Sequence, residues 1–408
     1  FPGRGRVRRV FETSRVMASS DEELFSLKGV RVADTSSPLL RRMLVHLVTH
    51  TFSFMPSSIK RWLAGTVPGS DPAHLSAHLI LDLDQQLLLR YSRSKRVPPD
   101  FPAVRHLPHS RAAMSRDAGL VAGPAAQMAA TMDLLMSRPG TDSAAEDEEV
   151  PGRLYVPSTE GSGLGGLMVY FHGGGWVQGS VASHEGLCQA LAHRLGMRVL
   201  SVEYRLAPEH VFPAPLEDAW TAYKYAHSNK CSLTGGSGSG GPLVLAGDSA
   251  GGNLAAVVAL RAANAGCAAD AQLLLYPVTD LVEQQPSRLA FAEGFFLTRS
   301  NMQFYQDCYV PVGVNRRDPE VSPAYMDERS ATRLPRALVV TAGYDVLRDE
   351  GKMYYEKLQR AGVRAAYLNC EGCIHGFLNF GCTLRARSEL GRVCAALQGL
   401  LLLREGEN

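Results

Sequence analysis

The stretch that decides the fold reads PLVLAGDSAGG over residues 242–252, and a run rich in Ala, Val and Leu follows it to Ala265. The apolar residues 243–246 predict a buried strand, and the run from Leu254 to Ala265 predicts a helix. Between them lies a Gly-x-Ser-x-Gly sequence centred on Ser249. A sharp strand-to-helix turn holds such a serine in a strained backbone conformation, and glycines beside it supply the room. The stretch therefore predicts a nucleophilic serine at the end of a strand.

A second glycine-rich sequence, HGGGW over residues 172–176, ends the apolar strand predicted over 167–171. Consecutive glycines let backbone N–H groups point at a substrate carbonyl without interference from side chains. The helix predicted after Ser249 adds an unpaired N–H group and the positive end of its dipole. A phosphate-binding loop is a weak alternative, because no Lys-Ser/Thr pair follows and the GxGxxG spacing is absent. The candidate oxyanion-hole residues are Gly173, Gly174, Gly175 and Ala250, and the candidate supporting residues are His172, Asp248 and Trp176.

Together these sequences resemble the hormone-sensitive-lipase-like family of α/β-hydrolases, the bacterial family IV esterases, in the branch marked by GDSAG, to which arylacetamide deacetylase is related. The resemblance runs from Leu75 to the C-terminus. It implies an α/β-hydrolase fold, with a mostly parallel central sheet flanked by helices and an N-terminal helical cap. Further matching stretches are YRLAPE at 204–209, FPA at 212–214, FLT at 296–298, LDLD at 81–84 and VPGRLY at 150–155.

The catalytic acid is expected to be Asp345, which lies just past the apolar strand predicted over 337–341, at the carboxyl edge of a parallel sheet. The D-x-L-x-D-E sequence of the resembled family falls on the same residue. Asp349 and Glu350 open the next predicted helix, where carboxylates complement the helix dipole. Because the chain order in this fold is serine, acid, histidine, the base is expected to be His375, the single histidine after Asp345.

These residues predict carboxylic ester hydrolysis through a Ser-His-Asp triad and an acyl-enzyme intermediate. The expected substrate is a small-molecule ester with a short to medium acyl chain. No metal and no organic cofactor are expected, since the triad needs none and no ligand-spaced His/Cys cluster offers one. Amide hydrolysis, as in arylacetamide deacetylase, uses the same residues and stays open as an alternative. A non-catalytic small-molecule receptor on the same fold is less favoured, because His375 is present.

The order of predicted elements divides the chain into three parts. Short apolar runs alternate with helical patterns in a catalytic α/β domain over 141–408, residues 36–140 predict a helical cap, and residues 1–35 are expected to form a disordered leader. The cap helices are read from apolar residues at helical spacing. Their stripes are Leu40, Met43, Leu44 and Leu47, then Leu83, Leu87 and Leu88, and then Met128, Met132 and Leu135.

Charge and composition bear on partners and location. The 42 basic and 40 acidic side chains leave a net charge of +2, so no nucleic-acid partner is expected. The apolar stretch 39–55 is interrupted by Arg41, Arg42, His46 and His50, so no stable membrane insertion is expected. Eight scattered cysteines favour reduced thiols and a cytoplasmic location, and a homodimer is a candidate assembly.

One cysteine pair, Cys370-x-x-Cys373, lies directly before His375. A zinc site would need a second pair at suitable spacing, and Cys382 and Cys394 do not form one. A thiol switch that moves His375 is a minor hypothesis. Two partly buried thiols are the favoured interpretation.

Overall fold

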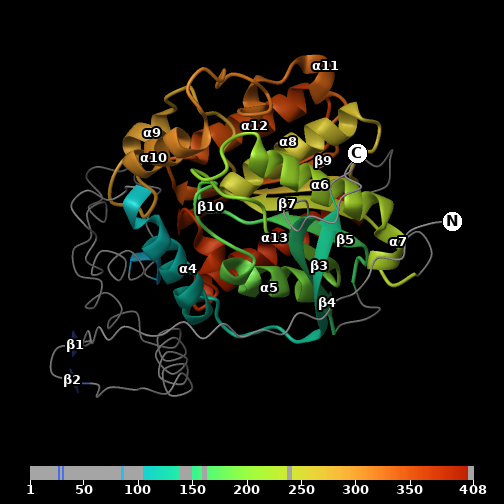
Figure 1. The fold of residues 1–408 in the computed structure, drawn as a ribbon, viewed down its shortest axis with the longest axis horizontal. Helices are drawn as coiled ribbons and strands as arrows, with labels where there is room; N and C mark the ends of the chain where they lie inside the picture. The colour runs from blue at the N-terminus through green and yellow to red at the C-terminus, as the bar shows by residue number, and fades with distance from the viewer. Residues whose placement is uncertain are drawn as a thin grey trace.

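The computed structural model describes residues 104–137, 149–158, 163–236 and 241–402, together with the segments 26–27, 30–31 and 84–86. Its centre is a sheet of eight strands in the order β10-β9-β8-β7-β5-β6-β4-β3 (Figure 1). The strands from β10 to β6 in this order run parallel, and β4 and β3 are antiparallel to their neighbours. The prediction of a mostly parallel sheet is confirmed.

The bounds of the elements agree with most of the predicted strands and helices. The strands are β3 (Met128–Ser137), β4 (Glu149–Pro157), β5 (Leu167–Phe171), β6 (Arg198–Val202), β7 (Leu243–Asp248), β8 (Ala271–Leu275), β9 (Arg336–Tyr344) and β10 (Ala365–Ile374), and β1 (Ser26–Leu27) pairs with β2 (Val30–Arg31). The helices are α4 (Leu107–Val121), α5 (Glu185–Leu195), α6 (Ala214–Ser228), α7 (Lys230–Leu233), α8 (Ala250–Asn264), α9 (Pro286–Ala290), α10 (Arg299–Tyr309), α11 (Glu328–Ala331), α12 (Arg348–Arg360) and α13 (Leu384–Leu402). Short 3-10 helices are η1 (Val104–His106), η3 (Ala182–His184), η4 (Pro323–Tyr325) and η5 (Phe377–Asn379).

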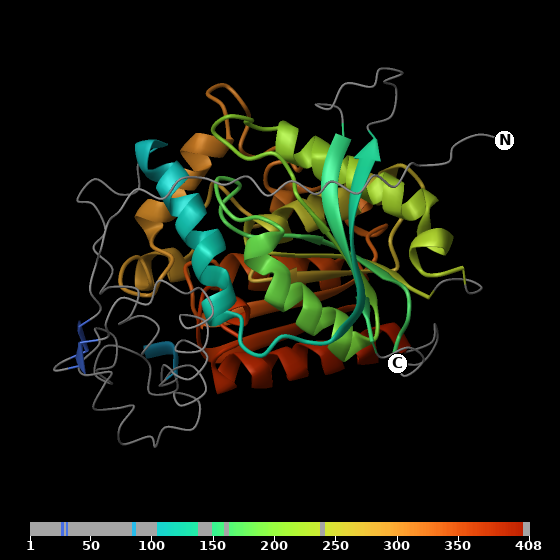
Figure 2. The same ribbon diagram turned by 60° about the horizontal axis from the view of Figure 1, so that its bottom comes forward.

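Helices cover both faces of the sheet (Figures 1 and 2). Helices α6, α8 and α12 pack on one face, and α5 and α13 pack on the other. Strand β5 shows why both faces need cover: Leu167, Val169 and Phe171 join the first apolar cluster, whereas Met168 and Tyr170 join the second. A strand that is apolar on both faces belongs at the centre of a parallel sheet.

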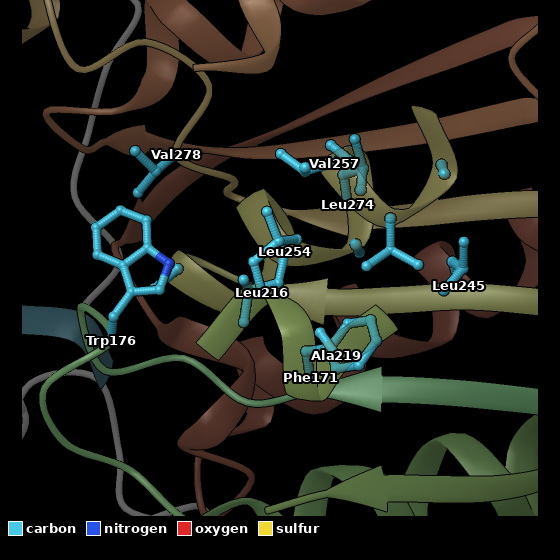
Figure 3. Close-up of a cluster of buried hydrophobic side chains, with 14 of the residues drawn as sticks. Phe171, Trp176, Leu216, Ala219, Leu245, Leu254, Val257, Leu274 and Val278 are labelled. Atoms are coloured by element: carbon cyan, nitrogen blue, oxygen red, sulfur yellow. The ribbon is translucent and has the colours of Figure 1, made fainter. Parts of the chain in front are cut away.

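The face under α6 and α8 holds the larger core (Figure 3). Leu254 of α8 and Leu216 of α6 pack with Phe171 and Leu245 of the sheet. Helix α8 is buried along almost its whole length, because Gly, Ala and Val dominate its first three turns and let its axis approach the strands closely. The turn at Ser249 therefore leads into a helix that is buried against the sheet.

The helix predicted from Met128, Met132 and Leu135 is wrong, because these residues lie on strand β3. Strand β4 pairs with β6 along one edge, and its other edge is free to accept a partner. Residues 128–137 take that place in antiparallel register, and the ladder of backbone hydrogen bonds outweighs the helical spacing. Met132 and Leu135 are exposed, so no buried stripe existed to favour a helix. The sheet thus includes residues that the sequence assigned to the helical cap.

The other predicted cap helices fall largely outside the described residues. The stripe beginning at Leu40 lies entirely outside them. The stripe residues of the second predicted helix, Leu83, Leu87 and Leu88, also lie outside them, and residues 84–86 between these are described and helical. Within the ranges that are described, no helix combines the length and the apolar character needed to cross a bilayer.

A buried ion pair ties α9 to the start of α12. Glu350 and Arg288 are both almost completely buried, and the Arg288 guanidinium donates to Glu350 Oε2 at 2.7 and 3.0 Å. The other carboxylate oxygen accepts the backbone N–H of Thr279 at 2.9 Å. Glu350 therefore does more than complement a helix dipole, and burial raises the pKa of this carboxyl while Arg288 opposes the rise.

We expect Glu350→Gln to lower the free energy of unfolding by about 3–5 kcal/mol, because it leaves the Arg288 charge buried and unpaired. Denaturant unfolding followed by circular dichroism measures the change. Glu356→Gln in the same helix is the control: its partner Lys352 lies 3.7 Å away on the surface, so we expect a loss below about 1 kcal/mol. Equal losses in the two variants would contradict the structural role of the buried pair.

Candidate active site

Three predicted residues follow three strands that end at the same edge of the sheet. Ser249 comes directly after β7, Asp345 after β9 and His375 after β10. Because β7, β8, β9 and β10 are parallel neighbours, their carboxyl ends point the same way. Side chains at these ends converge, as is usual for sites on open α/β sheets.

Ser249 sits on a strained turn between β7 and α8. Its φ is 56° and its ψ is −117°, a conformation that L-residues rarely adopt. A Cβ atom on Gly247 would lie 2.2 Å from the Gly251 carbonyl oxygen, and one on Gly251 would lie 1.9 Å from the Phe171 carbonyl oxygen. Only glycine fits at either position, so the elbow requires the spacing seen in the sequence.

A chain of two hydrogen bonds joins the three side chains. His375 Nδ1 lies 2.7 Å from Asp345 Oδ2, and His375 Nε2 lies 2.9 Å from Ser249 Oγ. The other oxygen of Asp345 accepts the backbone N–H of Leu347 at 3.0 Å. Since the carboxylate is an acceptor, His375 carries its proton on Nδ1 and presents the Nε2 lone pair to the Ser249 hydroxyl. Less than 10 % of the surface of Ser249, Asp345 and His375 is exposed, so these hydrogen bonds are shielded from water.

The HGGGW sequence forms a tight turn beside Ser249. Gly174, Gly175 and Trp176 all have positive φ, at 120°, 64° and 59°. A Cβ atom on Gly174 would lie 2.1 Å from the Gln178 carbonyl oxygen, and one on Gly175 would lie 2.3 Å from the Tyr305 ring. These two glycines are needed for backbone conformation and also for packing.

The predicted oxyanion-hole residues divide into two groups. The N–H of Gly173 donates to Asp248 Oδ1 at 2.7 Å, so this donor is already used and Gly173 leaves the predicted set. In the described parts of the chain, the N–H groups of Gly174, Gly175 and Ala250 donate to no protein acceptor. Three N–H groups near the serine are therefore available to a ligand.

Asp248 is a buried carboxylate with four partners. The Tyr170 hydroxyl donates to it at 2.7 Å, Gly173 N–H at 2.7 Å and the Asn379 amide at 3.1 Å, and His184 Nε2 lies 3.4 Å away. Burial alone would raise the pKa of Asp248, but His184 and the hydrogen-bond donors outweigh it and lower the pKa to about 2. The charged side chain thus connects the strand end, the glycine turn and the loop after His375.

His172 fixes the first peptide of the glycine turn. Its Nδ1 lies 2.9 Å from the Gly173 carbonyl oxygen, and its ring stacks on Tyr204 at 4.2 Å. Burial and the nearby His184 lower the pKa of His172 to about 3, so the ring is neutral at neutral pH. His172 therefore orients backbone and is not the general base.

Sequence reasoning missed the residues of α10 that pack on this turn. The Tyr305 ring lies against Gly175, and the Tyr309 ring stacks on Trp176 at 4.3 Å with 4° between the planes. The one signal in the sequence was that Tyr305 and Tyr309 lie one helical turn apart, which predicts that they share a face of α10. This spacing does not show that the face packs on a glycine turn more than 120 positions earlier in the chain.

The cysteine pair near the base is buried. Cys370 and Cys373 lie in β10 and neither side chain is accessible. Burial raises the pKa of the Cys370 thiol, which disfavours the reactive thiolate. This environment supports the interpretation of buried thiols.

Comparisons with known proteins agree with this geometry. Residues 168–379 match the sequence pattern of the α/β hydrolase fold family. The chain is similar to carboxylic ester hydrolase LipN of Mycobacterium tuberculosis, at 39% identity over 57% of this chain and 61% of that protein. It is also similar to carboxylesterase NlhH of the same species, at 37% identity over 62% of this chain and 79% of the relative. The match to LipN thus spans about three fifths of that relative's length.

A solved structure places the same elements in space. The esterase of Pyrobaculum calidifontis superposes with a TM-score of 0.67 at 32% identity, covering 78% of this chain and 99% of that protein. Sequence pattern, curated relatives and solved structure thus point the same way. The chain belongs to the α/β hydrolase fold family, within its hormone-sensitive-lipase-like group of esterases.

Proposed function

We propose that this chain hydrolyses carboxylic esters of small molecules, with Ser249 as nucleophile, His375 as base and Asp345 as the group that orients the base. The observation that carries the proposal is the hydrogen-bond chain from Asp345 through His375 to Ser249. A serine hydroxyl is a weak nucleophile at neutral pH unless an adjacent base accepts its proton. The pairing at 2.9 Å is within the reach that general-base catalysis requires.

The first half of the reaction forms an acyl-enzyme. Ser249 Oγ attacks the ester carbonyl carbon while its proton passes to His375 Nε2. The carbonyl π electrons move to oxygen, and Asp345 stabilises the imidazolium without taking its proton. When the C–O bond breaks, His375 returns the proton to the departing alcohol.

The second half releases the acid. Water gives a proton to His375 Nε2 as its oxygen attacks the acyl carbon, and collapse of the intermediate returns that proton to Ser249 Oγ. Atoms and charges balance with water as the one co-substrate. The chemistry requires neither a metal nor an organic cofactor.

The oxyanion of both intermediates is assigned to the N–H groups of Gly174, Gly175 and Ala250. Ala250 begins α8, so the positive end of the helix dipole adds to its N–H. Preorganised donors of this kind contribute several kcal/mol to transition-state stabilisation. We assign Asp248 a positioning role, because it accepts hydrogen bonds from the Gly173 N–H and the Asn379 amide and so joins the glycine turn to the loop after His375.

The name of one relative supports the proposed substrate class. An ethyl acetate hydrolase of Pseudomonas putida is 33% identical over 71% of this chain and 89% of that protein. Such a relative supports short to medium acyl esters and does not favour the amide or receptor alternatives. The helical cap, the cytoplasmic location and the homodimer stay predictions.

Replacing the nucleophile tests the triad. We expect Ser249→Ala to abolish hydrolysis of p-nitrophenyl butyrate and labelling by a fluorophosphonate, while circular dichroism stays unchanged. The control is Ser232→Ala, because this exposed serine only donates to the Asn229 carbonyl. Turnover retained by the Ser249 variant would refute the assignment.

Replacing Asp248 tests the positioning role. We expect Asp248→Ala to lower kcat about 100-fold or more, because the glycine turn and the loop after His375 lose their shared anchor. Asp248→Asn keeps an acceptor and should lose less. Asp133→Asn is a matched control, since Asp133 is exposed and pairs with Arg153. Wild-type kcat in the alanine variant would exclude the role.

A substrate panel tests ester preference and chain length. We expect acetyl, butyryl and octanoyl p-nitrophenyl esters to be hydrolysed faster than the lauroyl ester, and p-nitroacetanilide more slowly than the acetyl ester. An amide places a poorer leaving group on the same acyl carbon, so its departure needs more help from His375. Faster turnover of the anilide would favour the amide alternative.

A further inference from the structure

An arginine of helix α4 contacts the residue that follows the HGGGW turn. Helix α4 precedes the residues that match the family pattern, and it lies beside α10 in both views of the ribbon (Figures 1 and 2). Arg111 Nε donates to the Val177 carbonyl at 2.7 Å, and Arg111 Nη2 donates to the Ala207 carbonyl at 2.8 Å. The Trp176 carbonyl in turn accepts the N–H of Ala207 at 2.9 Å. One side chain thus joins the turn to the segment that runs beside it.

Glu209 holds the Arg111 guanidinium in the orientation that makes these contacts. Arg111 Nη1 and Nη2 donate to the two Glu209 oxygens at 2.9 and 2.8 Å. The hydrogen bonds from Arg111 lower the pKa of Glu209. A two-point pair fixes the guanidinium plane, which a lysine ammonium cannot reproduce.

Gln178 connects the same helix to α10 across the turn. Ser110 Oγ donates to Gln178 Oε1 at 2.6 Å, and Gln178 Nε2 donates to the Tyr305 hydroxyl at 3.0 Å. The backbone N–H of Gln178 donates to the Gly174 carbonyl at 3.0 Å. Both ends of the Gln178 amide are therefore fixed by helices that flank the glycines.

The turn needs such external contacts. Three consecutive residues, Gly174 to Trp176, have positive φ, and neither a helix nor a strand of the described chain includes them. Backbone in sparsely populated conformations persists when its surroundings over-determine it. The Arg111 and Ser110 contacts fall on Val177 and Gln178, two and three residues after Gly175, whose N–H group is assigned to the oxyanion.

We propose that Arg111, assisted by Ser110, is a positioning residue of the oxyanion hole, so that α4 holds the Gly174 and Gly175 N–H groups at the place where the oxyanion forms. The inference rests on the proposed ester hydrolysis. It assigns to a helix of the N-terminal region an effect on the chemical step, whereas a lid would act on substrate binding.

The test compares Arg111→Ala, Arg111→Lys and Ser110→Ala with Arg116→Ala, a control on the exposed side of α4 whose guanidinium bonds to Asp117. For each variant we would measure kcat and KM with p-nitrophenyl butyrate. We would also measure the inhibition constant of a trifluoromethyl ketone, whose hemiketal oxyanion needs the same donors. Unfolding by denaturant reports stability separately.

We expect both Arg111 variants to lose about 10- to 100-fold in kcat, with KM changed less than about threefold. The inhibition constant of the ketone should rise by the same factor as kcat/KM falls. Ser110→Ala, which removes a single hydrogen bond, should shift both values in the same direction by a smaller factor. Arg116→Ala should match the wild type.

Three results would overturn the inference: Arg111 variants that match Arg116→Ala, a loss confined to KM, or a loss of kcat without weaker ketone binding. Should Arg111→Ala fail to fold, the Arg111→Lys and Ser110→Ala variants decide by the same criteria. An inactive wild type overturns the proposed function and this inference together. An active wild type with unaffected Arg111 variants overturns the inference alone.

Discussion

The site depends on how closely the first turn of α8 approaches the end of β5. Gly251 lies against the Phe171 carbonyl, and a Cβ atom on Gly251 would be 1.9 Å from that carbonyl oxygen. This contact lets β7 turn sharply into α8, and the sharp turn holds Ser249 at a positive φ. The same approach brings the strand end that carries the glycine turn next to the serine. Any side chain at Gly251 would push Ser249 away from the glycine turn.

The buried Asp248 carboxylate then connects the glycine turn to the loop after His375. Asp248 keeps a low pKa although it is buried, because each of its oxygens receives donors from other segments. An unpaired carboxylate in this position would cost several kcal/mol. The sequence predicted three N–H donors from Gly173, Gly174 and Gly175. The turn offers only two of them to a ligand, because the Gly173 N–H donates to Asp248.

The fold of the catalytic part was predictable where short-range signals agree. Strand β5 was predicted to the residue, because it is a continuous apolar run that is buried on both faces. Strand β3 was predicted as a helix, because the spacing of Met128, Met132 and Leu135 is helical and only pairing with the free edge of β4 overrides it. Periodicity carries no information on which edge of a sheet lacks a partner.

The sequence by itself determined the family and singled out Ser249, Asp345 and His375 as the proposed nucleophile, acid and base, because glycine spacing, strand ends and chain order can all be followed along the chain without its tertiary structure. Tertiary structure alone decided which backbone donors stay free and which helices hold them. The Gly173 bond to Asp248 spans 75 residues and the Arg111 bond to Val177 spans 66. Contacts at such separations arise only when the sheet and its helices are packed, so no local pattern specifies them.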